Sequence, residues 1–369
     1  MKIDVTHRDG NARVGFLTTA HGRIETPVFM PVGTYGSVKG MHPERLKSIG
    51  SQIILANAYH LYLSPGREII RGAGGIQKFS GWNGPVLTDS GGYQIFSLRE
   101  SLKITDEGAT FRSFLDGSEH FLTPEIIVEF QSDIGVDIAM MLDHCPPADA
   151  GREIISEAME RTTAWALRAL ETKRDSKTAL FGIVQGGTHL DLRKTHLKTM
   201  AELDFDGLAL GGFSVGEPPE VMHRLVAELG PEMDQTKPRY LMGVGRPLDL
   251  VKCVSAGIDM FDCVMPTRHA RNGQLFTSKG PLNIANSRFR SEISPPDPIC
   301  GCPTCKRFTL AYLSHLYRRK EILFHELATT HNLYFYLNLM RTLRDAIKLG
   351  RLKEESARLL DLLDKSGED

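Results

Sequence analysis

The sequence predicts an α/β protein built as a closed (β/α)8 barrel, a TIM barrel, that carries a zinc-binding insertion near its C-terminus. Three observations favour this fold class. Eight apolar segments recur along the chain, helical patterns lie between several of them, and no Gly-x-Gly-x-x-Gly motif follows the first segment. Alternating strands and helices imply a parallel sheet, and eight such units favour a closed barrel over an open doubly wound sheet.

The eight apolar segments are the expected barrel strands, and each leads into a polar or Gly-rich turn. They cover Thr26–Val32, Gln52–Ala56, Pro85–Leu87, Asp137–Leu142, Ala179–Val184, Gly207–Leu210, Arg239–Val244 and Ile258–Val264. Five strong helical patterns separate them, and Thr123 is the expected N-terminal cap of the first. These helices cover Pro124–Ile134, Arg152–Thr172, Leu190–Leu203, Pro218–Leu229 and Leu248–Ala256.

Two insertions interrupt the repeat and divide the chain into three predicted units. Residues 102–121 alternate like strands around Asp116-Gly117, which predicts a hairpin after the third barrel strand. We expect a barrel with N-terminal strands over residues 1–282, a zinc-binding subdomain over 283–331, and C-terminal helices over 332–369 that pack back on the barrel. The last strong helix is expected from Asn332 to Leu349, followed by an amphipathic helix that frays at Gly367.

Length and composition are typical of a globular protein. The chain has 369 residues, of which 41% are hydrophobic and 24% are charged. No apolar run is long enough to span a membrane, and the N-terminus lacks the apolar core of a signal peptide. We therefore expect a cytoplasmic protein that does not associate with membranes.

A basic segment follows the last predicted barrel strand. No acidic residue lies between Cys263 and Ser291, and Asp297 is the only one between Glu292 and Glu321. The net charge of −1 indicates no general affinity for nucleic acid, but phosphate binding needs only a local basic surface. The segment is therefore either an anion-binding surface or a solvated charged face. Its basic residues are Arg268, Arg271, Lys279, Arg288, Arg290, Lys306, Arg307, Arg318, Arg319 and Lys320.

Three predicted strands end in an aspartate, namely Asp89, Asp143 and Asp262. The carboxyl ends of barrel strands form the active site in this class of fold, so the three side chains should converge. A single aspartate there would most simply cap the next helix, but three of them, with Gln185 and Gly-Gly turns nearby, predict a polar recognition site. Carboxylates accept hydrogen bonds from the amino groups of a nucleobase.

Three further side chains have to be placed inside or outside this predicted site. Tyr93 and Met242 either stack on a flat ligand or belong to the core. Asp259 lies an odd number of residues from Asp262, so it should point to the other side of its strand, away from the mouth. The strand therefore offers one carboxylate to the site rather than a pair.

The spacing of Cys300, Cys302 and Cys305 indicates a metal site. Three cysteines in one Pro-rich loop suit a single tetrahedral ion, whereas the six cysteines of the chain do not suit a disulfide scaffold. A fourth ligand is needed, and spacing alone leaves three candidates, which are His315, His325 and His331. With four protein ligands the zinc would be structural. The other cysteines, Cys145, Cys253 and Cys263, are expected to be packing residues.

Several motifs occur in the order of one known family. They are Asp89–Leu98, Gln185–Gly187, Leu210–Glu217, Tyr240–Gly245 and Phe261–Arg271, together with Asn57–Leu61 and the Cys-x-Cys-x2-Cys element. The set, from about Val14 to His331, resembles the bacterial queuine tRNA-ribosyltransferases, or tRNA-guanine transglycosylases. The resemblance implies a pentosyltransferase of queuosine biosynthesis. Such an enzyme exchanges guanine at the wobble position of tRNAs with a GUN anticodon for 7-aminomethyl-7-deazaguanine, through a covalent ribosyl-aspartate intermediate.

The resemblance also implies roles for individual residues. Asp262 would be the nucleophile, Asp89 the general acid/base, and His331 the fourth ligand of one structural Zn2+ per subunit, at the start of the last long helix. The implied base contacts are Asp89, Ser90, Tyr93, Asp143, Cys145, Gln185, Gly212, Phe213, Val215 and Met242. The implied contacts to the tRNA anticodon loop are Thr267, Arg268, Arg271 and Lys279. A homodimer is also implied, in which Phe308, Tyr312 and His315 either form an interface or pack internally.

Two positions bear on the choice of base. Phe213 replaces the leucine that the family often has, which changes the pocket wall near the 7-substituent. Val215 is the bacterial-type residue and favours the aminomethyl precursor over queuine. Two other interpretations stay open: a non-catalytic RNA-binding subunit, which the presence of Asp89 and Asp262 disfavours, and a barrel glycosidase or sugar-phosphate enzyme, which would not explain the cysteine loop.

Overall fold

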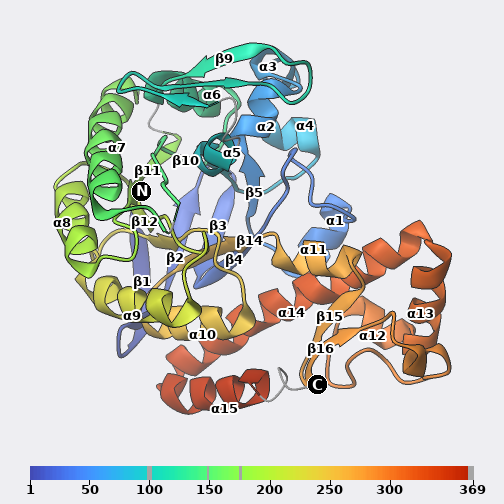
Figure 1. The fold of residues 1–369 in the computed structure, drawn as a ribbon. Helices are drawn as coiled ribbons and strands as arrows, with labels where there is room; N and C mark the ends of the chain where they lie inside the picture. The colour runs from blue at the N-terminus through green and yellow to red at the C-terminus, as the bar shows by residue number, and fades with distance from the viewer. Residues whose placement is uncertain (98–101, 148, 174–176, 365–369) are drawn as a thin grey trace.

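The computed structural model describes residues 1–97, 102–147, 149–173 and 177–364. Eight parallel strands form one sheet in the order β4-β14-β13-β12-β11-β10-β6-β5, with helices around it (Figure 1). All eight predicted barrel strands are confirmed. They are β4 (Val28–Pro31), β5 (Ile54–Asn57), β6 (Val86–Asp89), β10 (Ile138–Met140), β11 (Ala179–Val184), β12 (Gly207–Leu210), β13 (Arg239–Leu241) and β14 (Met260–Cys263).

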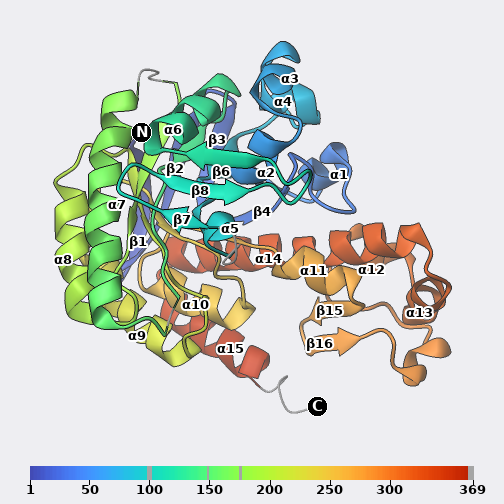
Figure 2. The ribbon, with the colours of Figure 1, turned by 45° about the horizontal axis from the view of Figure 1, so that its top comes forward.

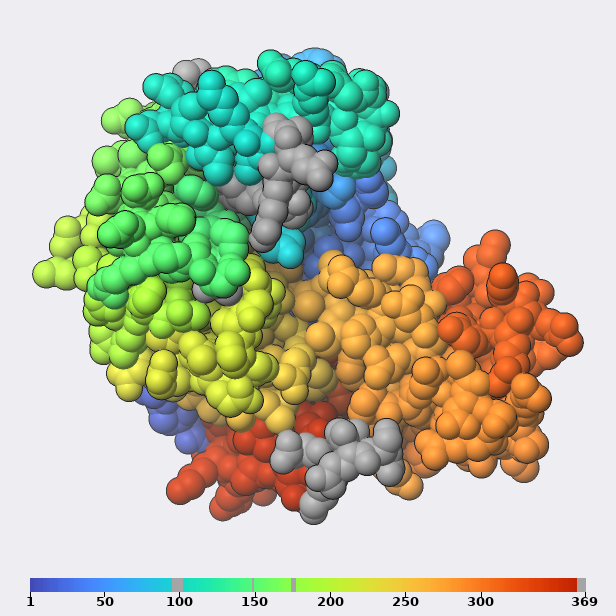
Figure 3. Space-filling view, in the orientation of Figure 1, coloured from blue at the N-terminus to red at the C-terminus, as the bar shows by residue number. Residues whose placement is uncertain are grey.

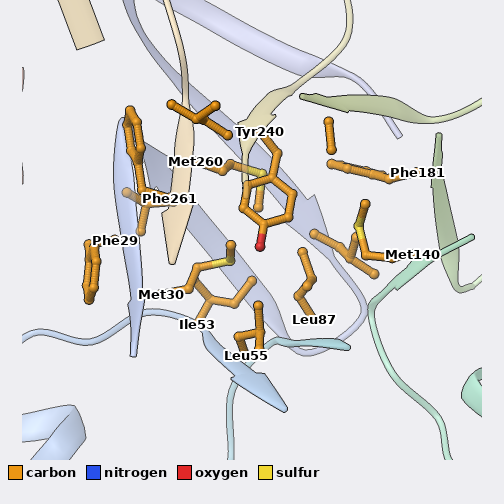
Figure 4. Close-up of a cluster of buried hydrophobic side chains, with 14 of the residues drawn as sticks. Phe29, Met30, Ile53, Leu55, Leu87, Met140, Phe181, Tyr240, Met260 and Phe261 are labelled. Carbon is orange, nitrogen blue, oxygen red and sulfur yellow. The ribbon is translucent and has the colours of Figure 1, made fainter. Parts of the chain in front are cut away.

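The barrel closes between its first and second strands. Val32 pairs with Leu55 in a parallel bridge, and the Gly33 N–H donates to the Leu55 carbonyl across 2.6 Å. Because both faces of the sheet are covered, the strands are apolar almost throughout, as parallel strands usually are. Figure 4 shows part of the buried core, in which Met30, Leu87 and Tyr240 come from different strands.

The five predicted helices are confirmed, each within two residues at either end. The Thr123 hydroxyl accepts a hydrogen bond from the Ile126 N–H across 3.3 Å, so it caps the first of them as expected. These helices are α6 (Pro124–Asp133), α7 (Arg152–Thr172), α8 (Leu190–Ala201), α9 (Pro219–Leu229) and α10 (Pro247–Ser255). Shorter ones are α1 (Pro43–Ser48), α2 (Ala58–Leu63), α3 (Arg67–Gly72), α4 (Ile76–Ser80), α5 (Gly92–Ser97), η1 (Gly230–Glu232) and α11 (Met265–Arg271).

An antiparallel N-terminal sheet covers the end of the barrel at which the strands begin. It consists of β1 (Ile3–Asp9), β2 (Ala12–Thr19) and β3 (Gly22–Thr26). Arg13 of β2 donates from Nε and Nη2 to the Asp259 carboxylate, at 2.9 and 2.6 Å, and both side chains are buried. Asp259 also accepts from the Arg239 N–H at 2.8 Å, so it is directed away from the mouth, as predicted.

The segment after β6 and α5 forms a small antiparallel sheet. Its strands are β7 (Lys103–Ile104), β8 (Ala109–Arg112) and β9 (Glu119–Leu122). β8 and β9 form the predicted hairpin around Asp116-Gly117, and the short strand β7 adds a third member that was not predicted.

The C-terminal part projects to one side of the barrel (Figure 2). It is built around a second buried apolar cluster, to which Leu275, Phe289 and Leu313 belong. Its elements are β15 (Gln274–Thr277), β16 (Gly280–Asn283), η2 (Ser287–Arg290), α12 (Pro303–Arg307), α13 (Leu310–Arg319) and the first turns of α14 (Ile322–Lys348). The rest of α14 and α15 (Leu352–Asp364) pack into the main core of the barrel. The division of the chain into three domains stays a prediction.

The predicted start of the last long helix is wrong. We expected it at Asn332, but α14 begins at Ile322, so His331 lies inside the helix rather than at its start. Residues 327–333 are all buried, and four of them are polar. Burial on every side removes the 3.6-residue alternation by which a helix is detected in a sequence. Leu98 and the expected fraying at Gly367 lie outside the described residues.

No helix among the described residues is both long enough and apolar enough to cross a lipid bilayer.

Candidate active site and metal centre

A cavity of about 630 Å³ opens at the carboxyl ends of the barrel strands. Figure 3 shows the same face as a space-filling surface, with a hollow between the yellow and orange segments. Most of the predicted base-site residues line it: Asp89, Ser90, Tyr93, Asp143, Cys145, Gly212, Phe213, Val215, Met242 and Asp262. Arg268 also lines it. The structure therefore brings together side chains from five different strand ends, as barrel geometry requires.

Asp262 lies near the end of β14, where two donors hold one of its oxygens. Oδ1 accepts from the Tyr240 hydroxyl at 2.6 Å and from the Gly243 N–H at 2.7 Å. Burial raises the pKa of the Asp262 carboxyl, while these two hydrogen bonds favour its ionised form. Within the described residues, Oδ2 accepts no hydrogen bond, so a lone pair of this oxygen is available to a ligand.

Asp89 ends β6, and its carboxylate is tied to the neighbouring strand end. Asn57 Nδ2 donates to Oδ2 at 2.6 Å, and the Ala58 N–H donates to Oδ1 at 3.0 Å. Burial raises the pKa of Asp89 to about 7, and the nearby Asp262 carboxylate adds to the rise. A carboxyl with this pKa exchanges its proton readily near neutral pH, which suits a general acid/base.

Asp143 follows β10 and joins two predicted base contacts. Ser90 donates to Oδ1 at 3.3 Å, and Gln185 Nε2 donates to Oδ2 at 2.6 Å. Burial raises the pKa of the Asp143 carboxyl to about 6. Gln185 itself is buried behind the cavity wall, and its Oε1 has no partner among the described residues.

The remaining predicted base-site residues form the walls. Tyr93 on α5 is 59% exposed, so it is not a core residue, whereas Met242 after β13 packs partly against the core. Phe213 is 4% exposed and lines the cavity, and the guanidinium carbon of Arg193 lies 3.6 Å from its ring centroid. Burial raises the pKa of the Cys145 thiol to about 12, so this cysteine contributes a neutral thiol to the cavity wall. Val215 donates its N–H to Glu217 at 3.1 Å.

The predicted RNA contacts lie on and beyond α11. Arg268 is exposed beside the cavity, and Lys279 is exposed at the turn between β15 and β16. Arg271 is half-buried and donates to the Thr267 carbonyl at 2.9 Å. Thr267 is 3% exposed and donates its hydroxyl to the Val264 carbonyl at 3.1 Å, so the structure places it in the helix interior rather than on the surface.

The three loop cysteines and His331 form one cluster, with all four ligand atoms within 4.8 Å of one another. Nδ1 of His331 lies 3.8, 3.5 and 3.2 Å from the sulfur atoms of Cys300, Cys302 and Cys305. Tetrahedral zinc with ordinary bond lengths would place sulfur and nitrogen about 3.5 Å apart. These residues therefore fit a closed structural metal site, and the structure favours His331 over His315 and His325.

The orientation of the His331 ring is fixed by its other nitrogen. Nε2 lies 2.7 Å from the Phe276 carbonyl, which can only accept, so Nε2 carries the proton and Nδ1 is free to bind a metal. The Phe276 N–H in turn is held by Asn332 Oδ1 at 3.0 Å. The cluster is thereby tied to β15 on one side and to α14 on the other.

Sequence reasoning missed three residues that shape this site. Tyr240 holds Asp262 but reads as a core aromatic inside a strand. Asn57 holds Asp89, and its position at the end of a strand could have indicated a site residue. Arg193 lies behind the cavity and donates to the carbonyls of Gly187 and Gly211 at 2.6 and 3.0 Å. In the sequence it resembles an ordinary surface residue of a helix.

The fold is that of a (β/α)8-barrel enzyme, with a candidate active site centred on carboxylates and a separate Cys3His cluster that fits a metal. The family model described as Queuine tRNA-ribosyltransferase matches residues 8–364. Queuine tRNA-ribosyltransferases of Francisella tularensis subspecies tularensis, novicida and mediasiatica are each 51% identical over 354 residues, which is 96% of this chain and 96% of theirs. The chain belongs to the queuine tRNA-ribosyltransferase family, the tRNA-guanine transglycosylases, which are pentosyltransferases.

Proposed function

We propose that this chain exchanges guanine at the wobble position of tRNAs with a GUN anticodon for 7-aminomethyl-7-deazaguanine. The observation that carries the proposal is the convergence of Asp89, Asp143 and Asp262 on one cavity. Each carboxylate is held by a different set of hydrogen-bond donors. Family membership supports tRNA as the substrate, in which the wobble base must leave the anticodon stack to reach the cavity.

Asp262 is the proposed nucleophile. A carboxylate oxygen bonds to ribose C1′ as the bond from C1′ to the purine nitrogen breaks, and the departing guanine takes the electron pair. Asp89 supplies the proton that neutralises guanine. The incoming base then loses its proton to Asp89 and attacks C1′, which releases the Asp262 carboxylate. One glycosidic bond replaces another, as in retaining glycosidases, so the exchange is balanced without a further reactant.

The remaining carboxylate reads the base. Asp143 accepts from the ring and amino N–H groups of the purine, and Gln185 and the Gly212 backbone read the same edge of the base. Tyr93 and Met242 enclose the ring. Val215 lies on the wall beside the 7-substituent and supports the small aminomethyl base over queuine. Ser90, Phe213 and Cys145 complete the proposed pocket.

The anticodon loop is proposed to bind across the basic segment. Arg268, Arg271 and Lys279 would hold phosphates, which position an RNA without reading its sequence. Of the two acids within that segment, Glu292 is exposed, whereas Asp297 is buried and accepts from the Ser278 N–H and hydroxyl at 2.8 and 2.9 Å. The Asp297 carboxylate is therefore paired inside the protein rather than presented to a phosphate. A tRNA substrate also supports a cytoplasmic location.

The ion of the Cys3His cluster is proposed to be zinc, one per chain, with a structural role. When bound it would fix the loop of Cys300–Cys305 against α14 beside the basic segment. It takes no part in the exchange, because all four positions of a tetrahedral ion are filled by protein.

A homodimer is proposed on the C-terminal part. Phe308 and Tyr312 stack with ring centroids 5.4 Å apart. Phe308 is partly buried against the second apolar cluster, whereas Tyr312 and His315 are exposed. An exposed tyrosine supported by a stacked aromatic ring suits a protein interface. Sedimentation of Tyr312→Ala, compared with the unchanged chain, tests it: an unaltered mass would contradict this interface.

Trapping of the covalent intermediate tests the function. The protein is incubated with unmodified tRNA and 7-aminomethyl-7-deazaguanine, denatured, and resolved for protein-linked RNA. We expect an adduct with the natural chain and none with Asp262→Asn. A rival sugar-phosphate enzyme would give neither an adduct nor salt-sensitive binding of tRNA to filters. Efficient exchange with queuine would contradict the proposed base preference.

A further inference from the structure

A buried arginine lies directly behind the proposed base-recognition loops. Arg193 is on the inner face of α8 and is 0% exposed. Its guanidinium donates to three backbone carbonyls: Nε to Gly187 at 2.6 Å, Nη1 to Gly211 at 3.0 Å, and Nη2 to Gly212 at 3.2 Å. Within the described residues it forms no ion pair, which is unusual for a buried arginine.

The side chain joins two loops that belong to different strands. The Gly187 carbonyl lies in the loop after β11, whereas the Gly211 and Gly212 carbonyls lie in the loop after β12. The guanidinium carbon is also 3.6 Å from the ring centroid of Phe213, so the cation stacks on this residue of the second loop. Only a planar group with several fixed donors reaches all of these partners at once.

The same helix holds the first loop at a second point. His196, one turn after Arg193, accepts the Gln185 N–H through Nδ1 at 2.8 Å. Burial lowers the pKa of His196 to about 4, so the ring stays neutral and keeps an acceptor nitrogen at working pH. α8 is thus the support to which the Gln185 side of the cavity is attached.

The direction of the bound carbonyls determines what the second loop presents to the cavity. Gly211, Gly212 and Phe213 line the cavity, but Arg193 does not. Because the C=O and N–H of a trans peptide point in opposite directions, carbonyls turned toward Arg193 leave the Gly212 and Phe213 N–H groups turned away from it. Neither N–H has an acceptor among the described residues.

We propose that Arg193 is a positioning residue for base recognition. By holding the Gly211 and Gly212 carbonyls from behind, it keeps the next two N–H groups directed into the cavity, where they donate to the exocyclic oxygen of the purine. The inference rests on the proposed function, because it takes the ligand of the cavity to be an oxopurine. Arg193 does not touch the base itself.

Binding of two purines tests the role of Arg193 independently of catalysis. Guanine and 2-aminopurine, which lacks the exocyclic oxygen, are titrated calorimetrically into the natural chain, Arg193→Met and Arg193→Lys. We expect the preference for guanine over 2-aminopurine to fall about tenfold in both variants, because a tenfold change corresponds to the loss of about one hydrogen bond. In exchange assays the KM for guanine should rise by a similar factor, while the KM for tRNA changes less than twofold.

Lys198→Met is the matched control, because Lys198 is exposed on the outer face of the same helix. Lys198→Met should leave the preference for guanine over 2-aminopurine unchanged. If Arg193→Met does not fold, Arg193→Lys decides: an unaltered preference, or equal losses for both purines, would overturn the positioning role. A natural chain that prefers guanine but exchanges no base would overturn the proposed function alone. A chain that binds neither purine would overturn both.

Discussion

The phenol of Tyr240 donates a hydrogen bond to Oδ1 of Asp262 across 2.6 Å, from one barrel strand to the next. Tyr240 is 1% exposed, and burial raises its pKa well above the ordinary range, so it remains a neutral donor at working pH. Together with the Gly243 N–H it fixes which carboxylate oxygen faces the cavity. The orientation of the proposed nucleophile thus depends on a side chain of the core.

Tyr240→Phe should slow formation of the covalent adduct about 10- to 100-fold, because a hydrogen bond to a charged group contributes about 1.5–3 kcal/mol. Single-turnover trapping measures this rate. Tyr336→Phe is the control, since its buried phenol donates to the Gly245 carbonyl at 2.6 Å rather than to a carboxylate. Equal rates for Tyr240→Phe and the natural chain would contradict the positioning of Asp262.

Asp89→Asn should change how stability depends on pH. The pKa of Asp89 is about 7 in the folded chain and 3.8 in its ordinary state, so the folded protein retains a proton that the unfolded chain has lost between these values. The free energy of unfolding therefore falls as the pH rises from about 4 to about 7. Urea unfolding at several pH values should show a shallower fall in Asp89→Asn. An identical slope would mean that Asp89 ionises normally.

Asp259→Ala and Asp262→Ala should have opposite effects, although the residues share a strand. Removing Asp259 leaves buried Arg13 without its partner, which costs about 3–5 kcal/mol of stability. Removing Asp262 should abolish exchange and leave folding and tRNA binding intact. Urea unfolding and the exchange assay, applied to both variants, separate the two roles. Near-normal exchange in Asp262→Ala would exclude it as the nucleophile.

Cys302→Ser should reduce the bound metal from one ion per chain to a small fraction, because Cys302 is one of the four clustered ligands. Elemental analysis of purified protein measures the ion and identifies it. The C-terminal part should lose resistance to proteolysis and tRNA should bind more weakly, while guanine binding stays unchanged. Cys253→Ser is the control, since this buried cysteine lies on α10, outside the cluster. Metal-free natural protein would refute the ligand set.

Arg268→Ala should weaken tRNA binding to a similar degree for every tRNA sequence and reduce the salt dependence of binding by about one charge. Filter binding at several salt concentrations measures both quantities. The affinity for guanine alone should not change. Lys198→Ala, at an exposed site on α8, should leave the salt dependence as it is. If Arg268→Ala binds tRNA normally, the phosphates lie elsewhere.

The barrel was predictable because its strands are apolar runs of ordinary length, and barrel geometry then places Asp89, Asp143 and Asp262 at one mouth. The cysteine spacing was equally informative. Tyr240 and Arg193 could not be assigned, since the sequence shows residue types but not the partners that a buried hydroxyl or guanidinium finds. The start of α14 was missed because Thr329 and Asn332 are polar yet buried.

Helix α14 joins the metal cluster to the mouth of the barrel. His331 reaches the cysteines, while Asn332 Nδ2 donates to the Pro266 carbonyl at 3.0 Å and Tyr336 binds the Gly245 carbonyl. A cut between His331 and Asn332 would sever a continuous helix and detach the metal ligands from these barrel contacts. In chimeras made from two relatives, the C-terminal part and the barrel should therefore come from the same parent, because a chimera that divides them would lose these contacts.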